Sequence, residues 1–336
     1  MKDVQGVRVF RDYTVDDQIG YGAYATVFRA TRQSDKKMVA IKELKTTTEN
    51  EGFSLTSLRE IQLLQQIKHK NIVEILEIIA DENFEKKNTP VSIVFEYMPH
   101  DLSTLIKYGK PLEDEEMKCY MVQILTALQF LHSISVLHRD VKTSNVLITE
   151  DNIVKLADFG LSRHEDEVGT YTPKMCTSFY RPPELFLGEE RYDSSVDMWS
   201  VGCVFAEMVK REPIFKGRDD IEVLNNIWDL LGTPQETEWP EFKNMKVFKT
   251  LRMPSERECI FQTKFRSINC GLLELLEKLL ALNPRKRITA SDALKDKYFT
   301  CQPLPLLPEK FVNSLVIILY NSVWYFIISN KYYISN

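Results

Sequence analysis

The hydrophobic periodicity of the chain changes near residue 114, and this change limits the possible folds more than any other feature. Before it, short apolar runs separated by polar segments predict strands: VFRA, MVAIKEL, IVEILEII and VSIVFEY. After it, apolar residues recur at helical spacing in DEEMKCYMVQILTALQFLH, SVDMWSVGCVFAEMV, IEVLNNIWDLLG and LLELLEKLLAL. Two short runs, NVLIT and IVKLAD, form a hairpin pattern between the first two of these helices. The sequence therefore predicts an α+β fold, with a small β-rich lobe followed by a larger helical lobe.

One helix is expected among the strands, beginning within EGFSLTSLRE at residues 51–60. Its apolar positions recur every three residues: Leu55, Leu58, Ile61, Leu64 and Ile67. Three residues fall about 60° short of a full helical turn, so these positions sweep around the helix. A helix that is apolar on several sides must be covered on several sides. We expect its own domain to cover one side and a partner to cover another.

The composition indicates an ordinary soluble chain. A length of 336 residues suggests about two domains, and the net charge of −5 gives no general reason to expect a nucleic-acid partner. The six cysteines never approach CxxC spacing, which argues against a zinc site or a disulfide framework and favours reduced thiols in cytosol or nucleus. The N-terminus, MKDVQGVRVFRDY, lacks the apolar segment of a secretory signal.

The far end of the chain departs from this composition. After QPLPLLP, residues 311–329 are strongly apolar and nearly long enough to span a bilayer. Asn313, Asn321 and three serines dilute that pattern. A membrane span and an atypical terminal extension are both open, and the extension is the favoured interpretation.

Two features of the β-rich part suggest a ligand site. The glycines of IGYGAYATV, residues 19–27, let the backbone approach a ligand closely, although a tight turn would use them too. Lys42 lies in the apolar run VAIK and must be paired or reach solvent, and Glu60 of the expected helix could pair with it. A purely structural ion pair is the alternative.

The helical part contains four residues whose side chains could bind a metal ion or take part in catalysis. LHRDVKTSN contains Asp140, Lys142 and Asn145, and LADFG contributes Asp158. Asn145 and Asp158 suit Mg²⁺, which prefers oxygen ligands together with substrate phosphates. Asp140 can orient or deprotonate a hydroxyl, and Lys142 can neutralise charge on a transferring phosphoryl group. Each residue alone could belong to a turn or a charged surface, but their order and spacing favour phosphoryl transfer.

Through these motifs, HRD-x-K-x-x-N, DFG and PPE included, residues 10–300 resemble the eukaryotic protein kinases. FSLTSLRE and LLGTPQETEWP make the chain similar to the cyclin-dependent kinases. The resemblance implies a bilobal kinase fold with an N-lobe at 10–97, a C-lobe at 98–300 and an apolar tail at 301–336 without a family counterpart. It also implies ATP and Mg²⁺ as cofactors, and a cyclin that binds the helix Phe53–Glu60 and swings Glu60 toward Lys42.

The family's ATP-binding positions correspond to Ile19, Gly20, Tyr21, Gly22, Ala23, Tyr24, Ala25, Thr26, Val27, Ala40, Lys42, Glu60, Glu96, Met98, Asp101 and Leu147. Ala25 replaces the third glycine of the loop, which removes no backbone amide. Since Ala23 stands where cell-cycle members carry threonine, Tyr24 is the one position of this pair that could take an inhibitory phosphate.

The resemblance also implies a regulatory activation segment. Thr172 occupies the phosphorylation position, and the receiving arginines correspond to Arg59, Arg139 and Arg163. A phosphothreonine carries nearly two negative charges and can hold several arginines. A plain loop hydroxyl is the alternative. Glu184 and Arg287 are expected to form a structural clamp.

EGFSLTSLRE, VFEYMPHDL and FYRPPELFLGEERY most resemble the transcriptional branch, whose members phosphorylate the C-terminal repeats of RNA polymerase II, and this implies a nuclear protein. The family's +1 pocket would place Met175 and Cys176 at its floor, with Arg181 satisfying a turned carbonyl, so that Ser-Pro or Thr-Pro sites are preferred. A cell-cycle kinase and a catalytically inactive binding scaffold are the alternatives. Lys42, Asp140 and Asp158 are all present, which argues against the scaffold.

Overall fold

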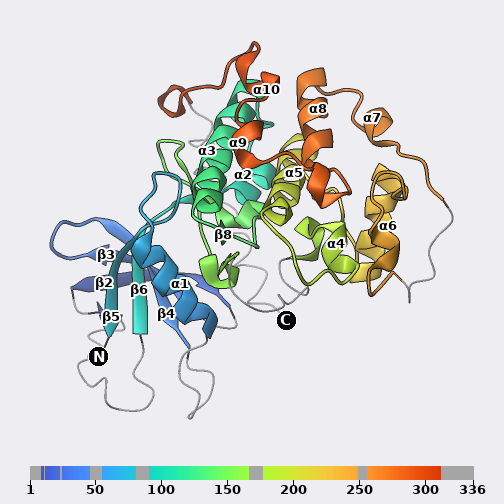
Figure 1. Cartoon of the computed structure of the whole chain (residues 1–336). Helices are drawn as coiled ribbons and strands as arrows, with labels where there is room; N and C mark the ends of the chain where they lie inside the picture. The colour runs from blue at the N-terminus through green and yellow to red at the C-terminus, as the bar shows by residue number, and fades with distance from the viewer. Residues whose placement is uncertain are drawn as a thin grey trace, which may run out of the picture. The chain divides into compact units, whose positions relative to one another are not determined.

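The structure is a computed structural model that describes residues 9–10, 12–22, 25–45, 55–80, 91–165, 177–248 and 256–311. The chain divides into two compact units. The first comprises Met1–Pro99 with Ala157–Gly160, and the second comprises His100–Leu156 with Leu161–Asn336. The first is rich in strands and the second in helices (Figure 1), which confirms the predicted α+β class with a smaller β-rich part and a larger helical part.

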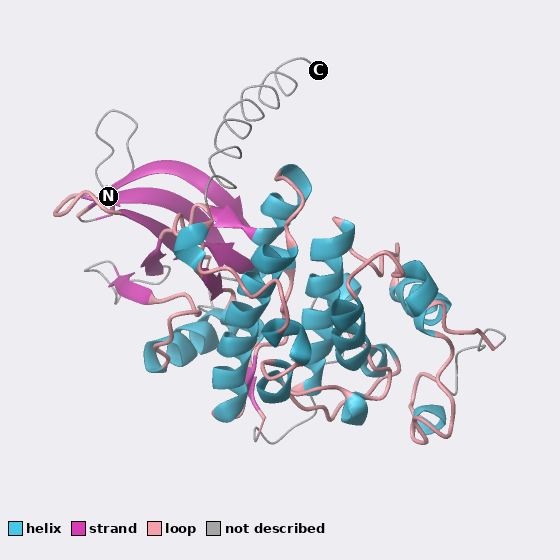
Figure 2. Ribbon diagram, turned by 90° about the horizontal axis from the view of Figure 1, so that it is seen from above, coloured by secondary structure: helices cyan, strands magenta, loops and turns pink. Residues whose placement is uncertain are grey.

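A six-stranded antiparallel sheet forms the first unit, in the order β1-β2-β3-β4-β6-β5. Its strands are β1 (Val9–Phe10), β2 (Tyr13–Tyr21), β3 (Ala25–Arg32), β4 (Met38–Leu44), β5 (Ile75–Ala80) and β6 (Val91–Glu96). They lie as one curved layer (Figure 2). Alternate residues of the central strands, among them Phe28, Ala30, Val39 and Ile41, are buried in one apolar cluster. β3 and β4 form the predicted hairpin, and the register sets Lys42 opposite Val27.

Helix α1 (Leu55–Gln66) is the helix expected among the strands. The inward residues include the polar Ser57 and Glu60 as well as Leu64, each at most 4% exposed. Leu58 is 42% exposed. Leu58 therefore lies on a side of α1 that the described residues leave exposed, which agrees with the expectation that its own domain covers only one side of this helix. Phe53 lies outside the described residues.

The second unit is built from α2 (Leu102–Tyr108), α3 (Asp114–Ser133), α4 (Pro183–Phe186), α5 (Ser195–Lys210), α6 (Asp220–Leu231), α7 (Phe261–Lys264), α8 (Cys270–Leu279), α9 (Ala290–Ala293) and α10 (Lys297–Thr300). Short strands accompany them: β7 (His100–Asp101), β8 (Val136–Leu137), β9 (Val146–Ile148), β10 (Val154–Leu156) and β11 (Arg163–His164). Helix α5 packs against both α3 and α8 (Figure 1), and its residues 196–208 are all buried. A helix that is buried all round explains why the SVDMWSVGCVFAEMV pattern is apolar beyond one stripe.

Capping residues mark several helix starts. Glu113 and Glu116 form a reciprocal capping box at the start of α3, and Asp219 caps α6 by accepting the Glu222 amide. The helix predicted from LLELLEKLLAL ends at Leu279, three residues before the apolar run does. The apolar character of Leu280 reflects burial in the core and not helix continuation.

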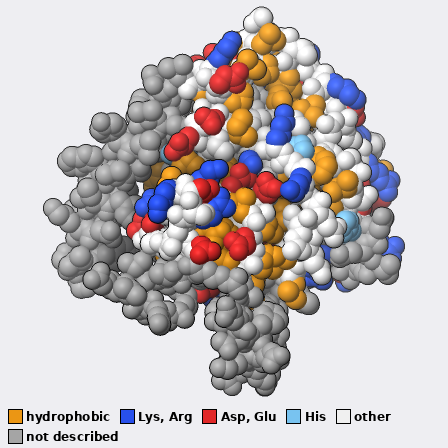
Figure 3. Space-filling model, turned by 90° about the vertical axis from the view of Figure 1, so that its left-hand side faces the viewer, with side chains coloured by type: hydrophobic (Ala, Val, Ile, Leu, Met, Phe, Trp, Pro, Cys, Tyr) orange, Lys and Arg blue, Asp and Glu red, His pale blue; other side chains and the backbone are white. Residues whose placement is uncertain are grey.

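The surface charges, the cysteines and the helix lengths can be compared with what the composition predicts. On the face drawn in Figure 3, acidic and basic side chains lie next to one another. Cys119, Cys203, Cys259, Cys270 and Cys301 are free, and Cys176 lies outside the described residues. No helix within the described part of the chain is long and apolar enough to cross a membrane, and residues 312–336 are not described.

Residues 301–311, which we name the C-terminal strap, are anchored along α3 by a buried lysine. Lys118 is fully buried, and its Nζ donates to the carbonyls of Cys301 at 3.1 Å and Pro303 at 2.6 Å. The same ammonium lies 3.2 Å from an oxygen of Asp114. A buried lysine is stable only when its charge and donors are satisfied, so the strap completes the environment of Lys118.

The rest of the strap follows the same helix. The Leu306 amide donates to the Glu115 carbonyl at 3.0 Å, and the Phe311 ring stacks on Tyr120 with centroids 5.1 Å apart. The strap therefore continues the fold of the second unit past α10.

Replacing Lys118 with methionine should lower the free energy of unfolding by about 2–4 kcal/mol, because two carbonyls of the strap and one oxygen of Asp114 lose their charged partner. Urea unfolding of the purified chain measures this change. The matched control is Lys297→Met, which removes an exposed pair with Glu274 and should destabilise the fold far less, because solvent screens an exposed ion pair. Equal effects from the two variants would contradict the anchoring role of Lys118.

Candidate functional site

The glycine-rich loop joins β2 to β3 in the first unit. The Gly22 amide donates to the Ala25 carbonyl at 2.9 Å, and Ala23 and Tyr24 lie outside the described residues. A Cβ at Gly20 would lie 3.3 Å from the Val27 Cβ, so glycine permits the close approach of the two strands. Thr26 is buried and Val27 half-buried, whereas Ile19 and Tyr21 are exposed.

One contact of this loop is missing from the sequence prediction. Lys45 Nζ donates to the Gly22 carbonyl at 2.6 Å and lies 3.4 Å from the centroid of the Tyr21 ring. The sequence shows a lysine three positions after Lys42, but the sequence alone does not show that its side chain contacts the glycine-rich loop.

Lys42 and Glu60 form the predicted ion pair. Lys42 Nζ lies 2.8 Å and 2.6 Å from the two carboxylate oxygens of Glu60 and 3.8 Å from Asp158. Burial alone would lower the pKa of Lys42, but the charges of Glu60 and Asp158 outweigh it and raise that pKa. The lysine therefore stays charged. The expectation that Glu60 lies away from Lys42 in the single chain is not met, because in this structure the two side chains are in contact.

Asp158 follows β10 in a left-handed conformation, with φ of 64°. This conformation is strained for a residue other than glycine and persists where the surroundings impose it. Its side chain is 51% exposed. A half-exposed carboxylate beside a buried ammonium is suited to hold a cation that also binds phosphate.

The second unit carries Asp140, Lys142 and Asn145 together. One carboxylate oxygen of Asp140 accepts from Lys142 Nζ at 2.7 Å and from Asn145 Nδ2 at 2.9 Å. Asn145 Nδ2 also donates to the Asp140 backbone carbonyl at 2.9 Å. Asp140 is 4% exposed, so these donors keep the carboxylate oriented. Because the amide nitrogen of Asn145 faces Asp140, its amide oxygen is the atom left to act as a metal ligand.

Asp197 on α5 fixes the loop that carries Asp140. Its two oxygens accept the backbone amides of His138 at 2.9 Å and Arg139 at 2.8 Å, and a third bond of 2.9 Å joins it to His132 Nε2. Burial alone would raise the pKa of Asp197, but these hydrogen bonds and the histidines outweigh it and lower that pKa. The sequence prediction did not include Asp197, although an aspartate inside the apolar run SVDMWSVG is an observable signal.

A second buried contact holds the same loop from its other side. Thr143 Oγ1 lies 3.0 Å from the Tyr180 hydroxyl and donates to Glu207 at 3.2 Å, and Tyr180 donates to Glu207 at 2.6 Å. Burial raises the pKa of Glu207, and burial next to Glu207 raises that of Tyr180. This group joins the loop to α5 and to the segment that precedes α4.

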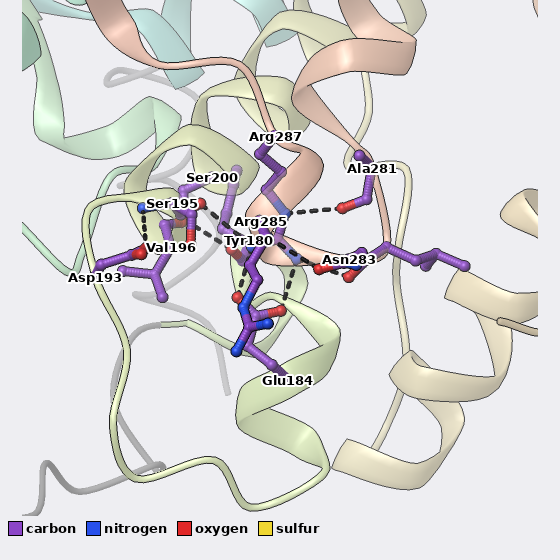
Figure 4. Close-up of polar contacts among 11 residues, drawn as sticks. Tyr180, Glu184, Asp193, Ser195, Val196, Ser200, Ala281, Asn283, Arg285 and Arg287 are labelled. Carbon is purple, nitrogen blue, oxygen red and sulfur yellow. Dashed lines mark hydrogen bonds and ion pairs between the residues drawn. The ribbon is translucent and has the colours of Figure 1, made fainter. Parts of the chain in front are cut away.

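Glu184 and Arg287 form the predicted clamp (Figure 4). The two guanidinium NH groups lie 2.5 Å and 2.6 Å from the two carboxylate oxygens, and both side chains are at most 1% exposed. Arg287 also donates to the Ala281 carbonyl, while Ser200 donates to the Tyr180 carbonyl nearby. The clamp ties α4 to the turn before α9.

The remaining predicted residues have local roles in the structure. Glu96 accepts the Glu74 amide at 3.0 Å, and Asp101 caps α2 by accepting the Thr104 amide at 2.9 Å. Ala40, Met98 and Leu147 are half-buried. Whether any of these residues contacts ATP stays a prediction.

The three predicted phosphate-binding arginines are all described. Arg59 lies on α1 of the first unit, and Arg139 and Arg163 belong to the second. Arg139 is 5% exposed and has a left-handed φ of 70°. Thr172, Met175 and Cys176 lie outside the described residues. Arg181 donates to Asp220 on α6 at 2.8 Å.

Comparison with known proteins supplies the context for these groups. Residues 13–299 match the family model described as Protein kinase domain. The chain is 40% identical over 307 residues to Cyclin-dependent kinase C-1 of Oryza sativa subsp. japonica, covering 87% of this chain and 59% of the rice protein. The chain thus spans about three fifths of that relative's length.

Two solved structures are similar as well. The crystal structure of the yeast RNA Pol II CTD kinase CTDK-1 complex matches with a TM-score of 0.81 at 34% identity, covering 91% of this chain and 98% of that one. A chain of the CAK complex from Chaetomium thermophilum bound to ATP-γ-S matches with a TM-score of 0.80 at 31% identity, covering 89% and 94%.

Replacing Asp197 with asparagine should lower the free energy of unfolding at pH 7 by about 3–5 kcal/mol, because a buried set of donors loses a charged acceptor. The lowered pKa of Asp197 stabilises the fold above about pH 4, the unfolded value, and this contribution is lost as the pH falls further. The difference between variant and wild type should therefore shrink below pH 4.

Urea unfolding between pH 3 and 7 measures this difference in the free energy of unfolding, and the substitution Asp151→Asn at an exposed position is the control. A difference that stays constant over this pH range would show that the charge of Asp197 is not its cause.

Proposed function

The chain belongs to the protein kinase family, and on that premise we propose that it is a cyclin-dependent, proline-directed serine/threonine kinase. It would transfer the γ-phosphate of ATP to hydroxyl groups of proteins, with the RNA polymerase II C-terminal repeats as the favoured substrate and the nucleus as its place of action. One observation carries the catalytic part of the proposal. Asp140 is buried yet oriented by Lys142 and Asn145, as an aspartate that receives or positions a substrate hydroxyl must be.

Each group has a distinct role in this proposal. Lys42, kept charged by Glu60, would bind the α- and β-phosphates beneath the glycine-rich loop. Asp140 would orient the substrate hydroxyl and accept its proton, and Lys142 would stabilise the negative charge on the transferring group. The hydrogen bonds from Asp197 to the loop keep Asp140 in position without contact with substrate.

Asn145 and Asp158 fit a magnesium ion, since one offers an amide oxygen and the other a half-exposed carboxylate. In the described part of the chain no group of three His, Cys, Asp or Glu could hold a metal without further ligands. Two protein ligands do not fill the coordination shell of Mg²⁺, so the phosphate oxygens of a nucleotide would supply further ligands. When bound, Mg²⁺ supplies charge neutralisation to the phosphates.

Asp140→Asn and Asp158→Asn should each lower kcat by at least about a hundredfold, the usual contribution of such groups. Asp158→Asn should also weaken binding of Mg-ATP, whereas Asp140→Asn should leave it nearly unchanged. Steady-state kinetics and nucleotide titration of the purified cyclin complex separate the two effects. Asp151→Asn is the control, and full turnover by either site variant would refute the assignment.

The cyclin is proposed to cover the outer side of α1. Leu58 is exposed there, and the half-buried Ile61 lies one turn further along the helix. The inner side already contributes Glu60 to Lys42, so a partner on the outer side would hold that ion pair closed. Two findings support such a partner: the rice relative is a cyclin-dependent kinase, and the two similar solved structures are complexes.

Leu58→Glu should weaken cyclin binding at least about tenfold, because a charge would be buried in an apolar contact. Gln18→Glu adds the same charge at an exposed polar position of β2, away from the outer side of α1, and is the matched control. Calorimetric titration with the co-purified cyclin gives both affinities. A Leu58→Glu chain that binds as tightly as the control would place the cyclin elsewhere.

Regulation is proposed to act through Thr172. Its phosphate would be held by Arg59, Arg139 and Arg163, with charge-assisted bonds that order the activation segment. Tyr24 is the proposed inhibitory position in the glycine-rich loop. The activating phosphate would add to the effect of the cyclin.

A preference for proline after the phosphorylated residue completes the proposal. The similarity to a CTD kinase supports it, because the repeats of the polymerase are rich in Ser-Pro. In the proposed pocket the amide of a +1 residue finds no acceptor, which costs about 1–3 kcal/mol and is avoided by proline.

A Ser-Pro peptide should therefore be phosphorylated roughly ten- to hundredfold faster, in kcat/KM, than a Ser-Ala peptide with the same flanks. A peptide with N-methylalanine at +1 also lacks the amide hydrogen and should recover most of the rate. Equal rates for Ser-Pro and Ser-Ala would remove the pocket and the main reason to favour the polymerase. A fast Ser-Pro peptide with a slow N-methylalanine peptide would exclude the missing amide as the cause.

A further inference from the structure

The C-terminal strap has an outward side that its contacts with α3 do not explain (Figure 1, the red segment after α10). Leu304 and Leu307 are 51% and 52% exposed, and Lys310 is exposed as well. A single exposed leucine is ordinary, but two of them three residues apart in one short segment form a pattern. The bonds to Lys118 and Glu115 account for the inward side of the strap only.

The sequence and backbone of residues 304–308 favour a polyproline II helix. A proline ring fixes its own φ at about −65°, and the residue before a proline is confined to extended conformations. Leu304 and Leu307 both precede prolines, and Leu307 has φ of −74° and ψ of 139°. A polyproline II helix has three residues per turn, so the two leucines share one face. The short 3₁₀ helix Pro308–Lys310 also aligns residues three apart, so Lys310 continues that face.

The strap contains two Leu-Pro pairs, at residues 304–305 and 307–308. In each pair the leucine is exposed and the proline half-buried. Leu306 stands between the pairs, and its amide donates to the Glu115 carbonyl of α3 at 3.0 Å. The residue between the pairs is therefore held by this chain's own helix, whereas both pairs keep accessible surface.

We propose that residues 304–310 of the strap bind an SH3-type domain of a partner protein. Such a domain holds a polyproline II ligand in an aromatic-lined groove, where two pockets each take an apolar residue and the proline that follows it. The residue between the two pairs faces away from the groove. The run LPLLPEK has this pattern, and Leu306, the residue that would face away, is the one bonded to α3.

Lys310 determines the charge expected of the partner. It follows the second Leu-Pro pair by two positions and is exposed, so its ammonium group can pair with a carboxylate beside the groove. A ligand that binds in the opposite chain direction would need a basic residue before the first pair, where this chain has Cys301 and Gln302. The partner is therefore an SH3-type domain with an acidic residue next to its groove.

The contacts with α3 prepare the strap for such a partner. A free proline-rich segment loses conformational freedom when it binds, which lowers its affinity. In this chain Lys118 already holds two carbonyls of the strap, and Phe311 stacks on Tyr120. The folded chain should therefore bind at least as tightly as a free peptide of the same sequence.

The experiment titrates the purified full chain with a panel of purified SH3 domains that are known to bind P-x-x-P-x-K and P-x-x-P-x-R peptides. A synthetic peptide of residues 301–311 is titrated in parallel. The strap variants are Leu304→Glu, Leu307→Glu and Lys310→Glu. The matched controls are Ile260→Glu at the start of α7, which replaces an apolar residue that is 46% exposed, and Lys286→Glu at an exposed position before α9.

At least one domain of the panel should bind the wild-type chain. Leu304→Glu and Leu307→Glu should weaken this binding at least about tenfold, because a charge would enter an apolar pocket. Lys310→Glu should weaken it by a similar factor, because two carboxylates would face each other. Both control variants should keep the wild-type affinity, and all five should unfold in urea with the wild-type midpoint, since the replaced side chains are exposed.

Three results would overturn the inference. The first is a panel without any domain that binds the chain. The second is binding of the free peptide but not of the folded chain, which would show that α3 closes the strap against a partner. The third is an equal loss in strap and control variants, which would indicate general charge repulsion. An unchanged affinity of Lys310→Glu would refute the acidic residue in the partner. Because binding is measured without ATP or substrate, the result does not depend on the proposed activity.

Discussion

The buried carboxylate of Asp197 is the interaction on which the second unit depends. It accepts two consecutive backbone amides, those of His138 and Arg139, and bonds to His132 near the end of α3. One side chain therefore fixes the position of α3, α5 and the loop with Asp140 and Asn145. Without such an acceptor, two amides would be buried without partners, and the strained backbone at Arg139 would have no support.

The same principle applies to three other charged side chains in the described part of the chain. Arg287 meets Glu184 with two parallel bonds, Lys118 is satisfied by two carbonyls and Asp114, and Lys42 by Glu60 and Asp158. Such pairs add modest net stability compared with apolar packing, but they tolerate few alternative arrangements. In the first unit this requirement orients α1 so that Glu60 points inward and Leu58 outward.

The residues proposed for chemistry differ in how they are held. Asp140 is buried and bonded from two sides, as suits a group that must receive one hydroxyl in one orientation. Asp158 is half-exposed on a strained backbone, as suits a ligand for a cation that arrives with its nucleotide. Among the arginines proposed to bind the Thr172 phosphate, Arg139 is buried, whereas Arg59 and Arg163 are half-buried.

The sequence by itself predicted the main helices α1, α3, α5, α6 and α8, most strands of the large sheet, the hairpin of β9 and β10, and the kinase motifs. It also predicted the pairs Lys42–Glu60 and Glu184–Arg287. Periodicity, capping and motif spacing are local properties, and the pairs followed from resemblance to a family whose members share them. Only the tertiary structure decided that Asp197 fixes the loop of Asp140 and that Lys118 anchors the strap at residues 301–311. These contacts join residues far apart in the chain, and no local pattern specifies which distant partner will satisfy a buried charge once the core has packed.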